Sequence, residues 1–160
     1  MTVSLRAYSP VYKDQVFPEL VPNRYFKKYT SSSFIYRVLN LAGLHSNYFM
    51  VLVDSKGLVV GSIVLRKKLT LKKLSNDWFI YGVAIKNSYR GLGYGSALLS
   101  QTIDWCENKN VTKIFLWVDF ENTQAMKLYN KYGFIECNSS VQNIFGLKKP
   151  NKKLLIKYLS

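Results

Sequence analysis

The residues best suited to chemistry lie in one glycine-rich segment, Tyr89-Arg-Gly-Leu-Gly-Tyr-Gly-Ser96. Glycine at positions 91, 93 and 95 removes every second side chain, so backbone N–H groups can approach an anion without steric conflict. The pattern of apolar residues predicts a strand before this segment and a helix after it. The start of that helix would add unpaired N–H groups and a positive dipole end, and Arg90 adds a charged donor. The segment therefore predicts a pyrophosphate site.

Two other interpretations of this segment stay open. Glycines between a strand and a helix also occur in ordinary turns. The dinucleotide-binding fingerprint is a second possibility, with Asp119 in the place of its ribose-binding acid. That fingerprint needs glycine or alanine at position 96 when Gly91 and Gly93 begin it, and Ser96 stands there. The chain after Gly95 is also short for a dinucleotide fold, so a nicotinamide cofactor is not favoured.

A second motif follows one predicted helix and one predicted strand later. The segment Asn122-Thr-Gln-Ala-Met-Lys-Leu-Tyr-Asn-Lys-Tyr-Gly-Phe134 matches N-x-x-A-x-x-L-Y-x-x-x-G-F, and the earlier loop matches [QR]-x-x-G-x-[GA]. In this order and spacing the two motifs resemble those of the GNAT superfamily of N-acetyltransferases, over residues 78–134. The resemblance implies an acyltransferase that uses acetyl-CoA to acetylate an amine, in a single domain spanning residues 1–160.

The resemblance also implies where the cofactor lies. In that family the fourth strand, here 79–86, diverges from the fifth, here 113–118, and the pantetheine arm occupies the cleft between them. The amide of Ile85 or a neighbour would polarise the thioester carbonyl. Asn122 would contact the cofactor, although it also suits the N-cap of the next helix, and the two roles are compatible. The implied cofactor-binding residues are Val83, Ala84, Ile85, Arg90, Gly91, Leu92, Gly93, Tyr94, Gly95, Ser96 and Asn122.

The implied catalytic residue is Tyr129, which matches the family's general acid. A phenol has a pKa of about 10, above that of a thiol, so it keeps a proton that it can give to a leaving thiolate. Its helical spacing with Ala125, Leu128 and Tyr132 also suits a core-facing aromatic residue, which is the alternative interpretation.

The general base is the point at which the chain departs from the family pattern. Glutamates that many members carry on the fourth or fifth strand are replaced here by Tyr81 and Trp117. The remaining candidates are Asp77, Asp119, Glu121, His45 and a chain of water molecules. The missing acid keeps open a non-catalytic module that only holds coenzyme A.

Hydrophobic periodicity predicts the elements that must position these residues. Strands are expected at 5–8, 48–53, 58–65, 78–85, 113–118, 134–137 and 154–158, with a turn at 54–57. Helices are expected around 99–106 and 125–132, with a helix or turn at 10–17 and a weakly amphipathic region at 23–41. This order implies a mixed α/β fold with helices on both faces of a sheet. The GNAT resemblance adds six to seven strands, mostly antiparallel.

Composition argues against several other classes of protein. A chain of 160 residues with 48% apolar residues can fold without a disulfide or a metal, and Cys106, Cys137 and His45 fit no zinc pattern. No apolar run approaches the ~20 residues of a membrane helix, and no signal peptide is evident, so we expect a cytoplasmic protein with no membrane partner.

The formal charge of +14 has two interpretations. The lysines are scattered, which suits a solvated surface, but they could also bind an anionic partner such as a nucleic acid or the phosphates of coenzyme A. Nucleic acid is possible but not favoured. The acceptor site is expected at 23–47 and 138–151, which are rich in lysine and aromatic residues, so we expect a neutral or anionic amine. We expect the acceptor to be a small-molecule or protein amine, and the enzyme to be a monomer or homodimer.

Overall fold

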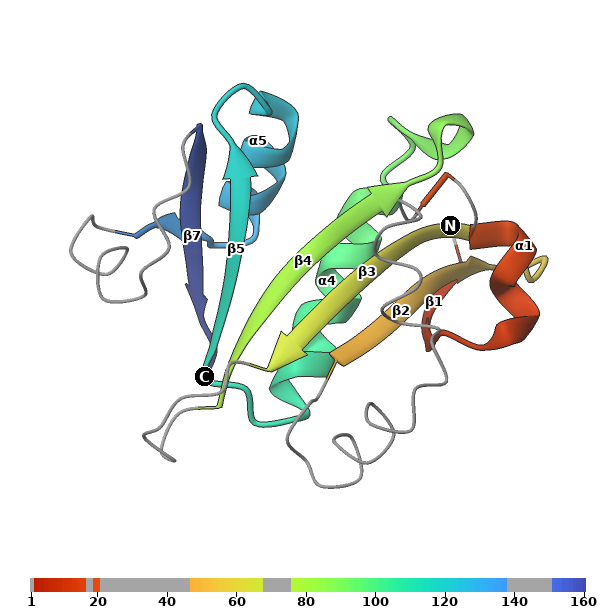
Figure 1. Ribbon diagram of the computed structural model, residues 1–160, viewed down its shortest axis with the longest axis horizontal. Helices are drawn as coiled ribbons and strands as arrows, with labels where there is room; N and C mark the ends of the chain where they lie inside the picture. The colour runs from red at the N-terminus through yellow and green to blue at the C-terminus, as the bar shows by residue number, and fades with distance from the viewer. Residues whose placement is uncertain (1, 17–18, 21–46, 68–75, 138–150) are drawn as a thin grey trace.

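The computed structural model describes residues 2–16, 19–20, 47–67, 76–137 and 151–160. These residues form a seven-stranded sheet in the order β1-β2-β3-β4-β5-β7-β6 (Figure 1). Within it only β4 and β5 run parallel, and the other neighbouring strands are antiparallel. The strands are β1 (Val3–Ala7), β2 (Asn47–Asp54), β3 (Val59–Lys67), β4 (Asp77–Ile85), β5 (Lys113–Asp119), β6 (Ile135–Glu136) and β7 (Lys152–Tyr158). The predicted mixed sheet is confirmed.

Helices cover both faces of this sheet, as predicted. On one face α4 (Tyr94–Glu107) buries Leu98, Leu99 and Ile103 in the largest apolar cluster, which also holds Tyr129 of α5 (Thr123–Lys131). On the other face α1 (Lys13–Val16), which follows the 3-10 helix η1 (Pro10–Tyr12), buries Val16 against β2 and β3. A second 3-10 helix, η2 (Asn87–Tyr89), lies between β4 and the glycine-rich loop.

The cleft that the family resemblance implied is present between β4 and β5. These strands pair only over Asp77–Ile80 and Lys113–Leu116, and beyond that point they diverge (Figure 1). The register of β4 on β3 explains the divergence, because Val64 faces Gly82 while Leu65 faces Ile80, which leaves Tyr81 as an extra residue. A bulge of this kind bends and twists its strand. The second half of β4 therefore stays on β3 and leaves β5.

The predicted elements differ from the observed ones mainly at their ends. The hairpin turn is present, with Gly57 at a φ of +81° and the Asp54 carboxylate accepting the Lys56 and Leu58 N–H groups. The strand expected at 134–137 is the two-residue β6. The helical region expected at 23–41 lies outside the described residues.

Candidate functional site

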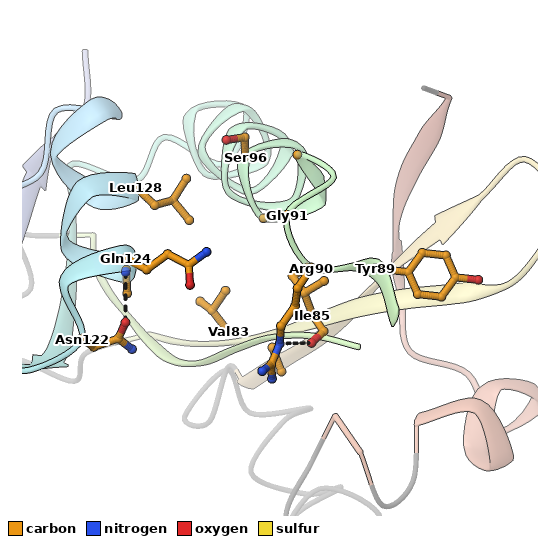
Figure 2. A pocket seen from close by; sticks show the side chains of 13 residues that line it. Val83, Ile85, Tyr89, Arg90, Gly91, Ser96, Asn122, Gln124 and Leu128 are labelled. Carbon is orange, nitrogen blue, oxygen red and sulfur yellow. Dashed lines mark hydrogen bonds between the residues drawn. The ribbon is translucent and has the colours of Figure 1, made fainter. Parts of the chain in front are cut away.

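A cavity of about 520 Å³ opens where β4 has left β5 (Figure 2). The end of β4 forms one wall, the loop into α4 forms a second, and the start of α5 forms a third. Its lining residues are Val83, Ala84, Ile85, Tyr89, Arg90, Gly91, Gly93, Gly95, Ser96, Asn122, Gln124, Ala125 and Leu128. Residues about 45 positions apart in the chain thus face one space.

The loop at one end of this cavity has a backbone that favours glycine. Gly91 and Gly93 have φ angles of +76° and +83°, in the left-handed region. Gly93 is the N-cap of α4, and the N–H of Ala97 donates to its carbonyl at 3.1 Å as the helix begins. The N–H groups before Ala97 have no partner within the helix. No side chain in the described chain caps this end, and the first turn carries no acid, so the site suits an anion.

Arg90 joins this loop to the end of β4. Its Nε donates to the Ile85 carbonyl at 3.2 Å, which Figure 2 shows as a dashed line. The side chain is exposed, and its remaining N–H groups can reach a charged ligand at the mouth of the cavity. Arg90 therefore has a positioning contact in addition to its charge.

The diverging half of β4 presents free backbone groups to the cavity. The N–H of Lys86 donates to the Val60 carbonyl at 3.0 Å, so Lys86 faces β3. Backbone groups alternate sides along a strand. The N–H and C=O of Ala84 therefore also point to β3, whereas those of Val83 and Ile85 point to the cavity. A ligand in the cleft can therefore pair with Val83 and Ile85, while Ala84 contributes lining but no backbone partner.

Asn122 lies at the opposite wall, as the N-cap of α5. Its Oδ1 accepts the Ala125 N–H at 3.0 Å, so the capping role is confirmed (Figure 2). The Nδ2 group remains for a ligand. Sequence reasoning missed Gln124 and Leu128 as lining residues. Their position in the first turns of a helix that begins at the cavity was the signal that could have identified them.

A second cavity of about 150 Å³ adjoins the first, because Val83, Asn122 and Ala125 line both. It lies in the gap between Ile80–Val83 and Leu116–Asp119 and also contacts Tyr129. The cleft therefore continues from the anion-binding loop to the gap beside the bulge of β4.

Tyr129 lines this second cavity although its side chain is only 8% exposed. Its ring packs against Phe134 with the ring centres 5.7 Å apart. Burial raises the pKa of Tyr129 to about 12, so the hydroxyl holds its proton at neutral pH. The two interpretations of this residue from sequence are thus compatible, since a largely buried ring still reaches the cleft.

The candidate bases are placed differently. Asp119 lines the second cavity and forms an ion pair with Lys152 at 2.9 Å. Asp77 is 5% exposed at the far, paired end of β4, where it accepts the Thr112 hydroxyl at 3.0 Å. Glu121 lines neither cavity, and His45 lies outside the described residues. Asp119 is thus the acid that the structure brings to the cleft.

Two of the residues expected to bind the cofactor do not line the cavity. Leu92 is 62% exposed, and the Tyr94 ring packs edge-on against Tyr89 with centres 5.4 Å apart. Only their backbone groups belong to the loop. In the part of the chain that the structure describes, no group of three or more His, Cys, Asp or Glu residues could hold a metal. Nor does any described helix combine the length and apolar character that crossing a membrane requires.

Comparison with known proteins places this cleft in a family. The chain is 40% identical over 55 residues to the mycothiol acetyltransferase of Renibacterium salmoninarum, covering 34% of this chain and 16% of that protein. It is 36% identical over 55 residues to the L-amino acid N-acetyltransferase AaaT of Escherichia coli, covering 34% of each. The chain therefore spans well under half the length of these curated relatives.

Solved structures resemble the whole chain. The paia N-acetyltransferase of Thermoplasma acidophilum, in complex with coenzyme A, superposes with a TM-score of 0.69 at 15% identity, covering 99% of this chain and all of that one. Arabidopsis thaliana Naa50, in complex with a bisubstrate analogue, gives 0.68 at 24% identity over the same shares. These likenesses show the fold. The model of the acetyltransferase (GNAT) family matches residues 13–134, and the chain therefore belongs to that family.

Proposed function

We propose that the protein is an N-acetyltransferase that moves an acetyl group from acetyl-CoA to an amine. The observation that carries this proposal is the continuous cleft. It joins an uncapped helix start, a free strand edge and a buried tyrosine in the order that the diphosphate, pantetheine arm and thioester of acetyl-CoA require. Relatives named as N-acetyltransferases, and related folds solved with coenzyme A or a bisubstrate analogue, support it.

The residues present fit acetyl-CoA. The N–H groups at the start of α4 and the Arg90 guanidinium would bind the diphosphate. The N–H and C=O groups of Val83 and the N–H of Ile85 would hold the amide-bearing arm as an added strand would, while the Ile85 carbonyl accepts the Arg90 Nε–H. Asn122 would donate from its Nδ2 group. This arrangement directs the thioester toward the gap that Tyr129 lines.

The chemistry follows from the groups around that gap. The N–H of Val83 or Ile85 would donate to the thioester oxygen and stabilise the charge that develops there. The acceptor nitrogen forms a bond to the acetyl carbon, the carbon–sulfur bond breaks, and Tyr129 gives its proton to the departing sulfur. Asp119 is our candidate for receiving the proton that the amine loses, directly or through water.

The acceptor should be neutral or anionic. Asp119, the carboxylate at the second cavity, is already paired with Lys152, so a polyamine finds no free counter-charge there. Thiol release with acetyl-CoA and a panel of amines tests both the activity and this preference. Spermidine as the best acceptor would refute the preference. No thiol release with any amine would refute the activity.

A coenzyme A-binding module without chemistry is the second candidate, favoured by Tyr81 and Trp117 at the positions where relatives carry a base. It predicts that coenzyme A binds but that no amine accelerates thiol release.

We further expect a cytoplasmic monomer or homodimer that acts on a small-molecule or protein amine. Sedimentation of the purified protein would decide the oligomeric state.

A further inference from the structure

Arg66 stands beside the acceptor end of the cleft and forms no ion pair with an acidic side chain of the described chain. It lies opposite Phe79 in the β3–β4 register, next to the bulge. Its guanidinium carbon is 5.9 Å from the centre of the Tyr81 ring, and that ring is held against Phe79 with the centres 5.8 Å apart. Tyr81 lines the second cavity and is 49% exposed. The positive charge of Arg66 therefore lies beside a residue that lines the cavity that would receive the amine.

No acidic side chain neutralises Arg66. All nine Asp and Glu residues of the chain are among the described residues, so no carboxylate side chain outside them can pair with Arg66. Asp119 and Glu136 are paired with Lys152 and Lys153, and no ion pair involves Arg66. The guanidinium carbon lies over the Tyr81 ring, and no hydrogen bond to another described residue engages the guanidinium donors. A partly buried guanidinium in this state is suited to bind a carboxylate in a two-point contact.

We propose that the acceptor is an amino acid-like molecule, an amine that also carries a carboxylate, and that Arg66 binds this carboxylate while Tyr81 aims the guanidinium. This inference rests on the proposed function and names the substrate class of the same cleft. The carboxylate is unchanged in the reaction. The amine nitrogen loses a proton and forms a bond to the acetyl carbon, as the acetyl–sulfur bond breaks and the sulfur takes a proton.

The test compares each amino acid with its own amide, for example L-phenylalanine with L-phenylalaninamide and glycine with glycinamide. The measured quantity is the ratio of kcat/KM for the acid to kcat/KM for the amide. The amines of the two forms differ in basicity, but this difference cancels when the ratio is compared between protein variants. In Arg66→Gln the ratio should fall by about tenfold or more, as expected for the loss of a charge-assisted hydrogen bond.

Lys67→Gln is the matched control. It removes one positive charge at the next position of β3, where the exposed side chain points to the opposite face of the sheet. Its ratio should stay at the wild-type value. Tyr81→Phe keeps the ring and should also keep the ratio, whereas Tyr81→Ala should lower it. Equal thermal shifts with coenzyme A across the variants would confirm that each one folds and binds the cofactor.

The outcomes separate the two proposals. If acids and amides are both acetylated and Arg66→Gln leaves the ratio unchanged, the role of Arg66 is overturned while the enzyme stands. If the wild type acetylates none of them although coenzyme A binds, the activity fails on this panel. Titration of the coenzyme A complex with N-acetyl-L-phenylalanine then decides the matter. Binding weakened about tenfold by Arg66→Gln supports the carboxylate site. Equal binding, or none, overturns it.

Discussion

At the scale of single residues, Tyr129 is the side chain on which the proposed chemistry most depends. Tyr129→Phe removes only the hydroxyl and keeps the ring that packs on Phe134. We expect kcat to fall by about 100-fold, because the departing sulfur loses its positioned acid. Coenzyme A affinity should stay close to the wild-type value, since the diphosphate and arm contacts lie elsewhere. Steady-state thiol release and calorimetric titration measure the two effects. A kcat within about twofold of wild type would place the proton source elsewhere.

The buried phenol of Tyr129 should also make stability depend on pH in the alkaline range. Its folded-state pKa is raised to about 12, above the ~10 of the unfolded chain. The unfolded state therefore releases its proton first, so the free energy of unfolding falls as pH rises from about 10 toward 12. Tyr129→Phe should lose less stability over this range.

Urea unfolding at several alkaline pH values measures this difference between wild type and variant. The buried Cys106 thiol, whose pKa burial also raises to about 12, contributes equally to both proteins and cancels in the comparison. Parallel pH profiles for the two proteins would show that the Tyr129 hydroxyl ionises as freely in the folded state as in the unfolded chain.

The roles of residues that depend on the local backbone could be predicted from the sequence. The anion-binding loop and the Asn122 cap each depend on neighbours within a few positions, so motif and spacing were enough. The contact between Arg66 and Tyr81 could not be predicted from local motifs. It joins two strands whose register is shifted by a bulge, and a one-residue change of register moves side chains to the other face.

At the scale of elements, the left-handed N-cap of α4 can be tested against a matched turn. Gly93→Ala and Gly57→Ala both place a side chain at a φ near +80°, and an added Cβ would meet no atom within 4 Å at either site. Each should lose about 1–2 kcal/mol of stability through backbone strain. Only Gly93→Ala should weaken coenzyme A binding, because only this residue shapes the loop at the cavity. Equal affinities in the two variants would separate the loop from the cofactor.

The same helix holds the edge of the sheet through Gln101. Its side-chain amide accepts the Leu5 N–H at 2.7 Å and donates to the Val3 carbonyl at 3.1 Å, so it occupies two of the outward backbone groups of the edge strand β1. Gln101→Ala should lower the free energy of unfolding by about 1–2 kcal/mol and accelerate amide exchange at Leu5.

The distal amide of Tyr8 is an internal reference for this experiment. Tyr8 directly follows β1, and its N–H donates to the Phe49 carbonyl of β2, so its exchange should change less than that of Leu5. Equal acceleration at the two positions would indicate general loosening of β1 and would contradict a specific contact by Gln101.

The positions of strands and helices were predictable because their apolar periodicity is strong, and the ends moved by only a few residues. The divergence of β4 from β5 was available only through the family resemblance. Its physical cause, the extra residue at Tyr81, depends on which residues of β3 face β4. No local preference in the sequence of β4 fixes that pairing.

At the scale of the whole molecule, the charge of +14 makes binding to polyanions a competing explanation for any phosphate-bearing ligand. Salt dependence separates binding in the cleft from binding by surface charge. A specific site uses a few backbone N–H groups at α4 and should depend weakly on salt. When nucleic acid binds to scattered surface lysines, many counterions leave its phosphates. The affinity of the protein for nucleic acid should therefore fall steeply as salt rises.

Melting temperatures of the intact chain with coenzyme A and with NAD separate binding in the cleft from binding by surface charge. Coenzyme A and NAD both carry a diphosphate and an adenosine, but only coenzyme A has an arm that can pair with Val83 and Ile85. A ligand at 100 times its Kd stabilises the folded state by about 2.7 kcal/mol, so coenzyme A should raise the melting temperature clearly more than NAD at equal concentration. The difference should persist near physiological salt and shrink in Gly93→Ala. Equal shifts from the two ligands that disappear together as salt rises would assign the binding to surface charge. That result would contradict coenzyme A binding in the cleft.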